Sequence, residues 1–168
     1  KLKSMAETLL FIQKHDFADF DALADYADAA SAKTKELTAK IKAAESRMAE
    51  IAVLKTHIIN YVKARDIYTA YRKVGYSRKY YDAHESDILI HKAAKKAFDE
   101  LALKKLPTVK SLQAEYSDLL VHKKLDYAEL SRARDEAKQL QIYKANAEML
   151  LRTDTEEQRQ TRERQQEK

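Results

Sequence analysis

Residues 37–62 read LTAKIKAAESRMAEIAVLKTHIINYV, and this stretch decides the fold. Apolar side chains recur in it at alternating steps of four and three residues: Leu37, Ile41, Ala44, Met48, Ile51, Leu54, Ile58, and then Tyr61 or Val62. Such steps return to the same face of an α-helix every two turns. The stretch is therefore predicted to be part of one amphipathic helix with a heptad-like apolar seam.

The predicted helix extends well beyond this stretch, because no strong stop signal occurs between Asp19 and Gly75. A helix over about 20–74 would be about 80 Å long and could not bury its apolar stripe alone. A second stripe follows Pro107 and continues to about Arg152: Val109, Leu112, Tyr116, Leu119, Leu130, Ala137, Leu140 and Leu150. The two stripes predict an all-α fold whose stalk is a long antiparallel helical hairpin, resembling a coiled coil.

Shorter helices are expected on either side of the first long helix. Leu2–Lys14 has an amphipathic pattern, and Asp16 is a candidate N-cap for the long helix. Residues 75–106 are predicted to form a small helical head, with Gly75 ending the long helix and Ser77 capping a short helix that runs through Ala83. A second short helix would start at Glu85 or Ser86.

The chain organisation predicted from these elements is one helical domain and a polar tail. The domain covers residues 1–152, with arms at about 20–74 and 107–152, and Pro107 is expected in the first turn of the second arm. The tail, 153–168, has no apolar residue, so we expect a solvated, frayed helix extension or a disordered segment.

Composition excludes several classes of protein. The 168 residues include one glycine, one proline and no cysteine, which argues against a turn-rich sheet protein, a disulfide and a thiolate metal site, and fits a cytoplasmic location. The longest apolar run is far below the roughly 20 residues of a bilayer span, and no signal peptide is visible, so no membrane partner is expected. Because the chain begins at Lys1, we expect it to be a piece of a longer protein or a shortened chain.

Positive charge is concentrated in YVKARDIYTAYRKVGYSRKYY, residues 61–81. This segment holds six of the ten tyrosines and six basic residues against one acid, a net charge of +5 that equals the net charge of the whole chain. Residues 61–110 carry +6 and the remaining residues −1. Interleaved cations and rings suit phosphates and exposed bases, so DNA is the expected partner. The candidate DNA-binding residues are Lys63, Arg65, Arg72, Lys73, Tyr76, Arg78, Lys79, Tyr80, Lys92, Lys95 and Lys96.

Structural roles compete with DNA binding at several of these positions. The lysines at 92, 95 and 96 share one side of a helix, where they either contact phosphates or form an ordinary solvated face. Three tyrosines lie near the seam, and at least two of them are expected to be buried: Tyr61, Tyr68 and Tyr71. Tyr76 and Tyr80 are the better candidates for exposure.

Neither a catalytic site nor a metal or cofactor site is predicted. A nucleophilic role for Tyr80 or Tyr81 would need a phosphate-bound metal held by clustered histidines, but the five histidines are scattered. His84 and His91 lie seven residues apart and are expected to pack or cap rather than to bind a metal. A single glycine excludes the common nucleotide-binding loops.

Three strings carry a family resemblance: KTHIINYVKARDIYTAYRKVGYSRKYYDAHESDI at 55–88, LIHKAAKKAFDELALKKLPTVKSLQAEY at 89–116 and YAELSRARDEAKQL at 127–140. They resemble the C-terminal part of relaxases, the mobilisation nucleases of bacterial integrative conjugative elements and plasmids. The resemblance covers about residues 2–152 in one order. The polar, glutamine-rich end that follows is also typical of such proteins.

The resemblance implies a parent protein that nicks the transfer origin of bacterial DNA, stays attached to the transferred strand and is exported through a type IV secretion channel. Its catalytic tyrosine and histidine-bound metal would belong to an N-terminal domain, and none of those motifs occurs here. A non-catalytic accessory role is therefore expected, through DNA or through other components of the relaxosome. The alternatives are a protein-interaction or secretion-signal module that contacts the type IV coupling protein, a homodimerisation module and a helical spacer.

Overall fold

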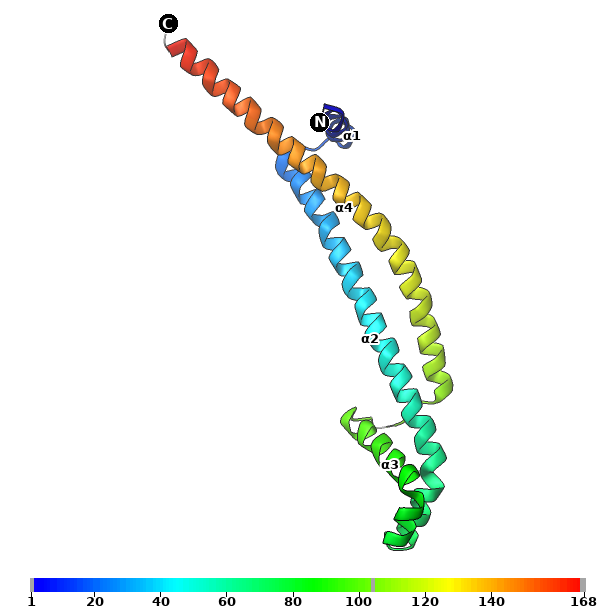
Figure 1. The fold of residues 1–168 in the computed structure, drawn as a ribbon. Helices are drawn as coiled ribbons and strands as arrows, with labels where there is room; N and C mark the ends of the chain where they lie inside the picture. The colour runs from blue at the N-terminus through cyan, green and yellow to red at the C-terminus, as the bar shows by residue number, and fades with distance from the viewer. Residues whose placement is uncertain (1, 104, 167–168) are drawn as a thin grey trace. The chain divides into compact units, whose positions relative to one another are not determined.

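The computed structural model describes residues 2–103 and 105–166, and all regular secondary structure in these ranges is helical. Figure 1 shows the four helices: α1 (Leu2–His15), α2 (Phe20–Lys73), α3 (Arg78–Glu100) and α4 (Val109–Gln166). The all-α prediction is confirmed, as is the presence of two long helices. Within this part of the chain, no helix is long and apolar enough to cross a membrane.

The polar tail continues α4 as far as Gln166. Of the two predictions for the tail, a helix extension or a disordered segment, the helix extension is the one found over residues 153–166. Its last two residues, Glu167 and Lys168, lie outside the described part of the chain. Exposed polar side chains surround this part of the helix, and Arg159 and Glu163 pair one turn apart at 3.3 Å. The helix therefore continues without an apolar face, on helix propensity and local pairs.

The caps at the starts of the helices differ from the prediction. Asp19, not Asp16, caps α2, because its Oδ1 accepts a 2.8 Å hydrogen bond from the backbone N–H of Ala22. Pro107 lies before α4 and not in its first turn. Thr108 is the cap, with Oγ1 accepting from the N–H of Ser111 at 3.0 Å. In both cases, the residue whose oxygen reaches the first free N–H groups sets the start of the helix.

The predicted pair of short head helices lies within α3, as two helical segments that meet at a kink. The kink falls at His84, whose φ of −132° and ψ of 26° are not helical, and this is the position between Ala83 and Glu85 where the break is predicted. Ser77 precedes α3 but makes no side-chain capping hydrogen bond, so the predicted Ser77 cap is wrong. Its carbonyl instead accepts from the N–H of Tyr81 at 3.0 Å.

The chain folds into two compact units. Unit 1 comprises Lys1–Ile41 and Leu125–Lys168, and unit 2 comprises Lys42–Lys124. The boundaries fall within α2 and α4, so this division differs from the predicted stalk and head. Within each unit, a stretch of α2 runs antiparallel to a stretch of α4, as expected for the arms of a long hairpin.

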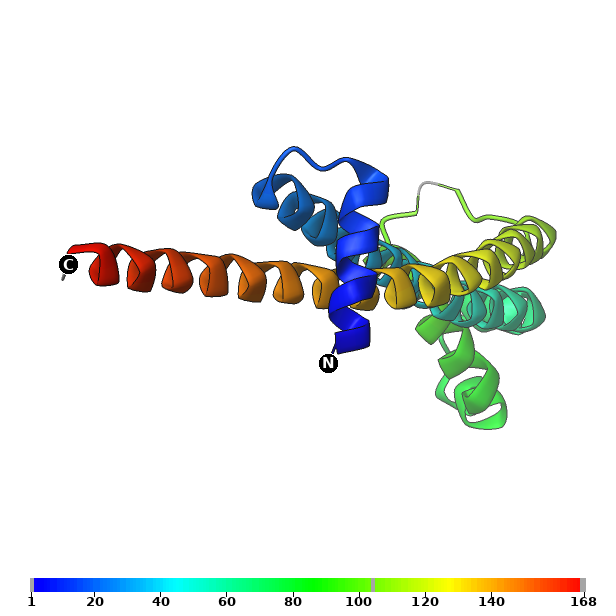
Figure 2. The same cartoon turned by 90° about the horizontal axis from the view of Figure 1, so that it is seen from above.

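Unit 1 has a thin apolar core and many polar links. Leu37 and Ile41 of α2 pack with Leu130 and Ala133 of α4. Figure 2 shows α1 crossing α4 steeply, and Asn146 of α4 binds α1 at this crossing. Its amide Nδ2 donates to the hydroxyls of Ser4 and Thr8, both at 2.9 Å. Since Thr8 is fully buried, this contact satisfies a polar group that burial would otherwise destabilise.

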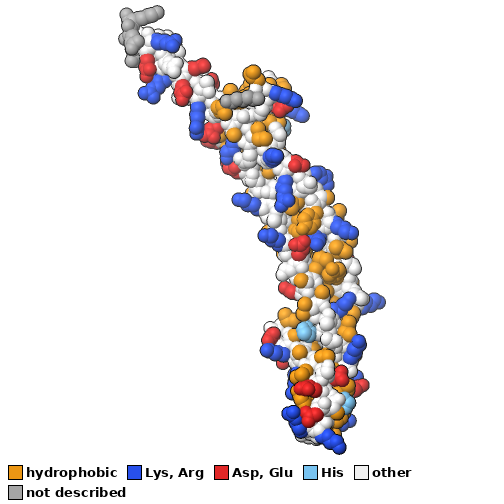
Figure 3. Space-filling model, viewed as in Figure 1, with side chains coloured by type: hydrophobic (Ala, Val, Ile, Leu, Met, Phe, Trp, Pro, Cys, Tyr) orange, Lys and Arg blue, Asp and Glu red, His pale blue; other side chains and the backbone are white. Residues whose placement is uncertain are grey.

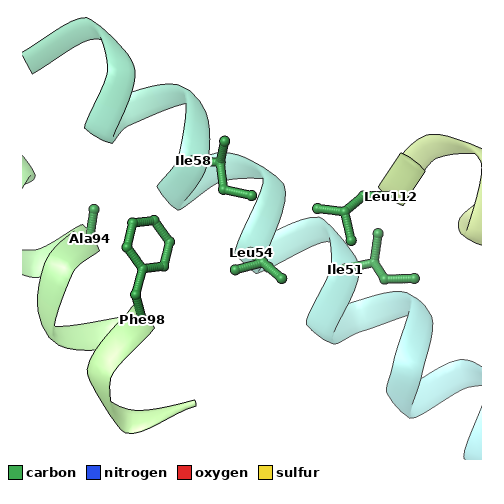
Figure 4. Packing of buried hydrophobic residues seen from close by; sticks show 6 residues of the cluster. All are labelled: Ile51, Leu54, Ile58, Ala94, Phe98 and Leu112. Atoms are coloured by element: carbon green, nitrogen blue, oxygen red, sulfur yellow. The ribbon is translucent and has the colours of Figure 1, made fainter. Parts of the chain in front are cut away.

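The core of unit 2 joins three helices. Figure 4 shows Ile51, Leu54 and Ile58 of α2 between residues of α3 and α4: Ala94, Phe98 and Leu112. Ile51 and Leu112 are 1% and 2% exposed. This core holds α3 beside α2. It thereby sets the positions of the basic and aromatic side chains between residues 61 and 96.

Candidate nucleic-acid interface

The turn between α2 and α3 is a Schellman motif. The N–H of Tyr76 donates to the carbonyl of Tyr71 at 3.0 Å, and the N–H of Gly75 donates to the carbonyl of Arg72 at 3.1 Å. Gly75 has φ 63°, which confirms its predicted left-handed conformation, and Tyr76 follows with φ 59°. The Tyr76 ring meets Tyr71 edge-on at 5.2 Å, the apolar contact that often accompanies this motif. Two basic pairs therefore flank one short turn: Arg72 and Lys73 before it, Arg78 and Lys79 after it.

A ladder of aromatic rings joins α2 to α3. His91 of α3 lies between Tyr61 and Tyr68 of α2, with ring centroids 4.6 and 4.0 Å away. Tyr71 continues the ladder toward Tyr80, at 6.2 Å. Tyr71 is buried, whereas Tyr61 and Tyr68 are half-buried, so the prediction that at least two of the three are buried is wrong.

The two tyrosines predicted to be exposed differ from each other. Tyr76 is 53% exposed, as predicted. Tyr80 is half-buried, with its ring 4.4 Å from that of His84, so the prediction of an exposed Tyr80 is wrong. The imidazole and the phenol meet because Tyr80 and His84 lie four residues apart at the start of α3. Tyr76 is therefore the ring best placed to contact a base.

All nine candidate cations are exposed, and three of them lie in local ion pairs. Arg78 pairs with Asp82 at 2.9 Å, Arg65 approaches Asp66 at 3.7 Å and Lys96 approaches Glu100 at 3.8 Å. Exposed pairs of this kind contribute little stability, so their cations can exchange a carboxylate for a phosphate at little cost. Among the described ion pairs, none includes the other six: Lys63, Arg72, Lys73, Lys79, Lys92 and Lys95.

Lys92 links the lysine group of α3 to the tyrosines. Its ammonium lies 6.0 Å from the Tyr71 ring centroid and 5.8 Å from that of Tyr81, within cation–π range. Lys92 therefore packs against tyrosine rings and is also an exposed charge. For this lysine, the sequence predicted only phosphate contact or an ordinary solvated face.

The net charge of +6 over residues 61–110 is not spread evenly over the elements of this region. Helix α3 contains five basic and five acidic residues, whereas residues 61–73 of α2 contain four basic and one acidic. Residues 101–110 add three lysines, of which Lys104 lies outside the described part of the chain. Figure 3 accordingly shows basic and acidic side chains side by side where α2 meets α3. The excess is therefore divided between residues 101–110 and the end of α2, where Arg65 and Arg72 share a face because they are seven residues apart.

The tyrosine pair at 80–81 has packing roles. The Tyr81 hydroxyl donates to Glu85 at 3.3 Å, and Arg78 lies 5.6 Å from its ring. Burial raises the pKa of the Tyr81 phenol, and the charge of Glu85 raises it further. A raised pKa disfavours the phenolate that a nucleophilic tyrosine would need.

The histidines of the head are also packing residues. His91 is 5% exposed, and its burial lowers the pKa of the imidazole, with a smaller contribution from the charge of Lys95. Among residues 2–103 and 105–166, no group of three or more metal-binding side chains is placed to hold an ion.

Sequence reasoning missed the aromatic ladder as a unit. Its signal was present in matching seven-residue steps, Tyr61 to Tyr68 on α2 and His91 to Phe98 on α3. These steps place two rings on the facing side of each helix. A comparison of this chain with protein-family models, curated proteins and solved structures finds no match.

Proposed function

We propose that this chain is a non-catalytic helical accessory domain of a relaxase, and that it binds DNA through the turn between α2 and α3. It would act in the bacterial cytoplasm as part of the relaxosome, and its parent protein would be exported with the transferred strand. The family assignment rests on the resemblance of residues 55–116 and 127–140 to relaxase C-terminal regions.

One observation carries the DNA-binding proposal: four exposed cations flank a single turn from which an exposed tyrosine projects. Arg72, Lys73 and Lys79 are in none of the described ion pairs, and the pair of Arg78 with Asp82 is exposed. Tyr76 is held in a left-handed conformation, a position where glycine or asparagine is more usual. Cations that flank an exposed ring are the elements of a surface that contacts phosphates and one base.

The proposal is tested by measuring DNA affinity against salt concentration for the wild type and for one quadruple variant. The variant replaces the four cations at the turn with glutamine: Arg72, Lys73, Arg78 and Lys79. Because each phosphate contact contributes about 0.9 to the slope of log K against log salt on duplex DNA, the slope should fall by about 3 to 4.

A matched control removes the same number and kinds of cation from unit 1. Its four glutamine substitutions fall at exposed residues in none of the described ion pairs: Lys35, Arg134, Lys138 and Arg162. Equal slopes for the turn variant and the wild type would reject the proposed surface. Equal losses in both quadruple variants would show that net charge matters and position does not.

A second candidate function, a protein-interaction module, is favoured by the outer face of α3. His91 and Phe98 face α2, whereas Leu89, Ile90 and Leu101 are 49%, 38% and 54% exposed. A coupling protein, another relaxosome component or a second copy would bury this face. Light scattering and pull-down with the coupling protein distinguish the candidates, because a monomer that binds DNA and captures no protein argues against this function.

A further inference from the structure

His91 is a buried titratable group with an unsatisfied nitrogen. Its Nδ1 has no hydrogen-bond partner among the described residues, although the side chain is only 5% exposed. The exposed His15 differs, because its Nδ1 lies 3.0 Å from the carbonyl oxygen of Phe11. A buried nitrogen without a partner is unusual in a folded protein, and it makes the imidazole sensitive to its own protonation state.

The surroundings of His91 favour the neutral ring. From α2, the two phenol rings of Tyr61 and Tyr68 cover its faces at 4.6 and 4.0 Å. From α3, Lys95 lies one turn after His91 and its charge opposes a second cation. Asp87 lies one turn before His91, and neither ring nitrogen of His91 forms a described ion pair with it.

We propose that His91 is an acid-sensitive latch: protonation of its imidazole releases α3 from α2. Neutral His91 stacks between the two tyrosines and closes the ladder. The protonated ring would bury a charge and a new N–H donor without an acceptor, so the imidazolium must leave the sandwich to reach water. Because His91 adjoins the core residues Ala94 and Phe98, its departure loosens the contact of α3 with Ile58.

Opposing effects act on the pKa of the His91 imidazole. Burial and Lys95 lower the pKa of the imidazole, so the neutral ring is retained in the folded state as pH falls to the ordinary histidine range. A cation–π attraction to the two phenols acts in the opposite direction. The pKa of His91 is therefore the quantity that tests the proposal.

The test is an NMR titration of the full chain from about pH 8 to about pH 5, with the five histidines and the alanine methyls resolved. We expect His91 to titrate below the ordinary histidine value of 6.5. We also expect the methyls of Ala64 and Ala94 in unit 2 to shift with it, while that of Ala133 in unit 1 stays constant.

A variant with a ring that cannot titrate separates the latch from general acid unfolding. His91→Phe keeps an aromatic ring in the sandwich, so the acid shifts of Ala64 and Ala94 should disappear, whereas they should persist in His122→Gln, which changes an exposed histidine. A pKa for His91 at or above the ordinary value of 6.5 in the wild type would overturn the proposal. Acid shifts of Ala64 and Ala94 that are unchanged in His91→Phe would also overturn it. Because the titration contains no DNA, its result is independent of the DNA-binding proposal.

Discussion

The contact of α2 with α4 and the contact of α2 with α3 are stabilised by different means. Ion pairs join α2 to α4 in both units, and in unit 2 Arg47 pairs with Glu115 at 2.7 Å. In unit 1, α2 and α4 are linked by ion pairs such as Lys40 with Asp126 at 2.9 Å, and Asn146 ties α1 to α4. In unit 2, rings and apolar side chains hold α3 to α2, and no ion pair among the described residues joins these two helices.

The difference determines which charged side chains take part in helix packing and which remain exposed. A thin core of leucine, isoleucine and alanine specifies the relative position of two helices weakly, and polar links across the seam add that specificity. Ring stacking in unit 2 needs no charged side chains, so the cations at the end of α2 remain at the surface. The packing of α3 against α2 therefore leaves basic side chains such as Arg72 and Lys73 exposed.

Core truncation should have the largest effect and should be larger in unit 2. Ile51→Ala removes a side chain that is 1% exposed from a core formed by three helices, and should lower the free energy of unfolding by about 2–5 kcal/mol. Leu130→Ala, in the smaller core of unit 1, should fall at the low end of this range. Urea denaturation followed by circular dichroism measures both, and a larger loss for Leu130→Ala would reverse the proposed ranking.

Loss of the polar link in unit 1 should come next. Asn146→Ala removes the amide that donates to Ser4 and Thr8, and should lower the free energy of unfolding by about 1–3 kcal/mol. Gln139→Ala is a suitable control, because Gln139 is exposed on the same helix. If Asn146→Ala is as stable as this control, the crossing of α1 over α4 does not depend on the amide.

A smaller, stabilising effect is expected where α3 ends. Ala102 adopts φ 49° in a second Schellman motif, in which the N–H of Leu103 donates to the carbonyl of Phe98 at 3.4 Å. Glycine avoids the steric cost of this conformation, so Ala102→Gly should raise the free energy of unfolding by about 0.5–1 kcal/mol. Tyr76→Gly relieves similar strain but loses the ring contact with Tyr71, and should gain less in the same urea experiment.

The smallest effect concerns acid stability. The hydrogen bond from Arg47 lowers the pKa of Glu115 below its ordinary value of 4.5. The pairing therefore stabilises the folded state above about pH 4.5, and this contribution is lost as pH falls further. Glu115→Gln should flatten the stability profile below pH 4.5, and Asp28→Asn should do the same in unit 1, because Lys144 lowers the pKa of Asp28. An unchanged profile in thermal melts at several pH values would show that these exposed pairs do not contribute.

The long helices were predictable because their signal is repeated over many residues. The eight seam positions from Leu37 to Tyr61 are all helical. Six of them are buried, and Ala44 and Tyr61 are half-buried. Caps were less predictable, because Asp16 and Asp19 both have suitable side chains and only the backbone path selects Asp19. The kink at His84 agrees with the break predicted between Ala83 and Glu85, whereas Ser77 lacks the predicted side-chain cap.

The candidate site was predictable in its charges and only partly in its geometry. Arg72, Lys73 and Lys79 are exposed because their charged ends favour water, which the sequence alone implies. The position of Tyr80 against Tyr71 and the stacking of His91 between two tyrosines depend on which faces of α2 and α3 meet. Residues far apart in the sequence set those contacts, so a count of local charge and aromatic content could not reveal them.

The most direct test of the DNA-binding proposal is residue-resolved NMR of the full chain titrated with a short DNA. Backbone amide shifts should change around Arg72 to Tyr80, with smaller changes near Lys63 and Lys92. Amides of unit 1 around Leu130 should stay constant. Shifts confined to unit 1, or no shifts at a DNA concentration that saturates binding, would contradict the proposal that the turn between α2 and α3 is the DNA-binding surface.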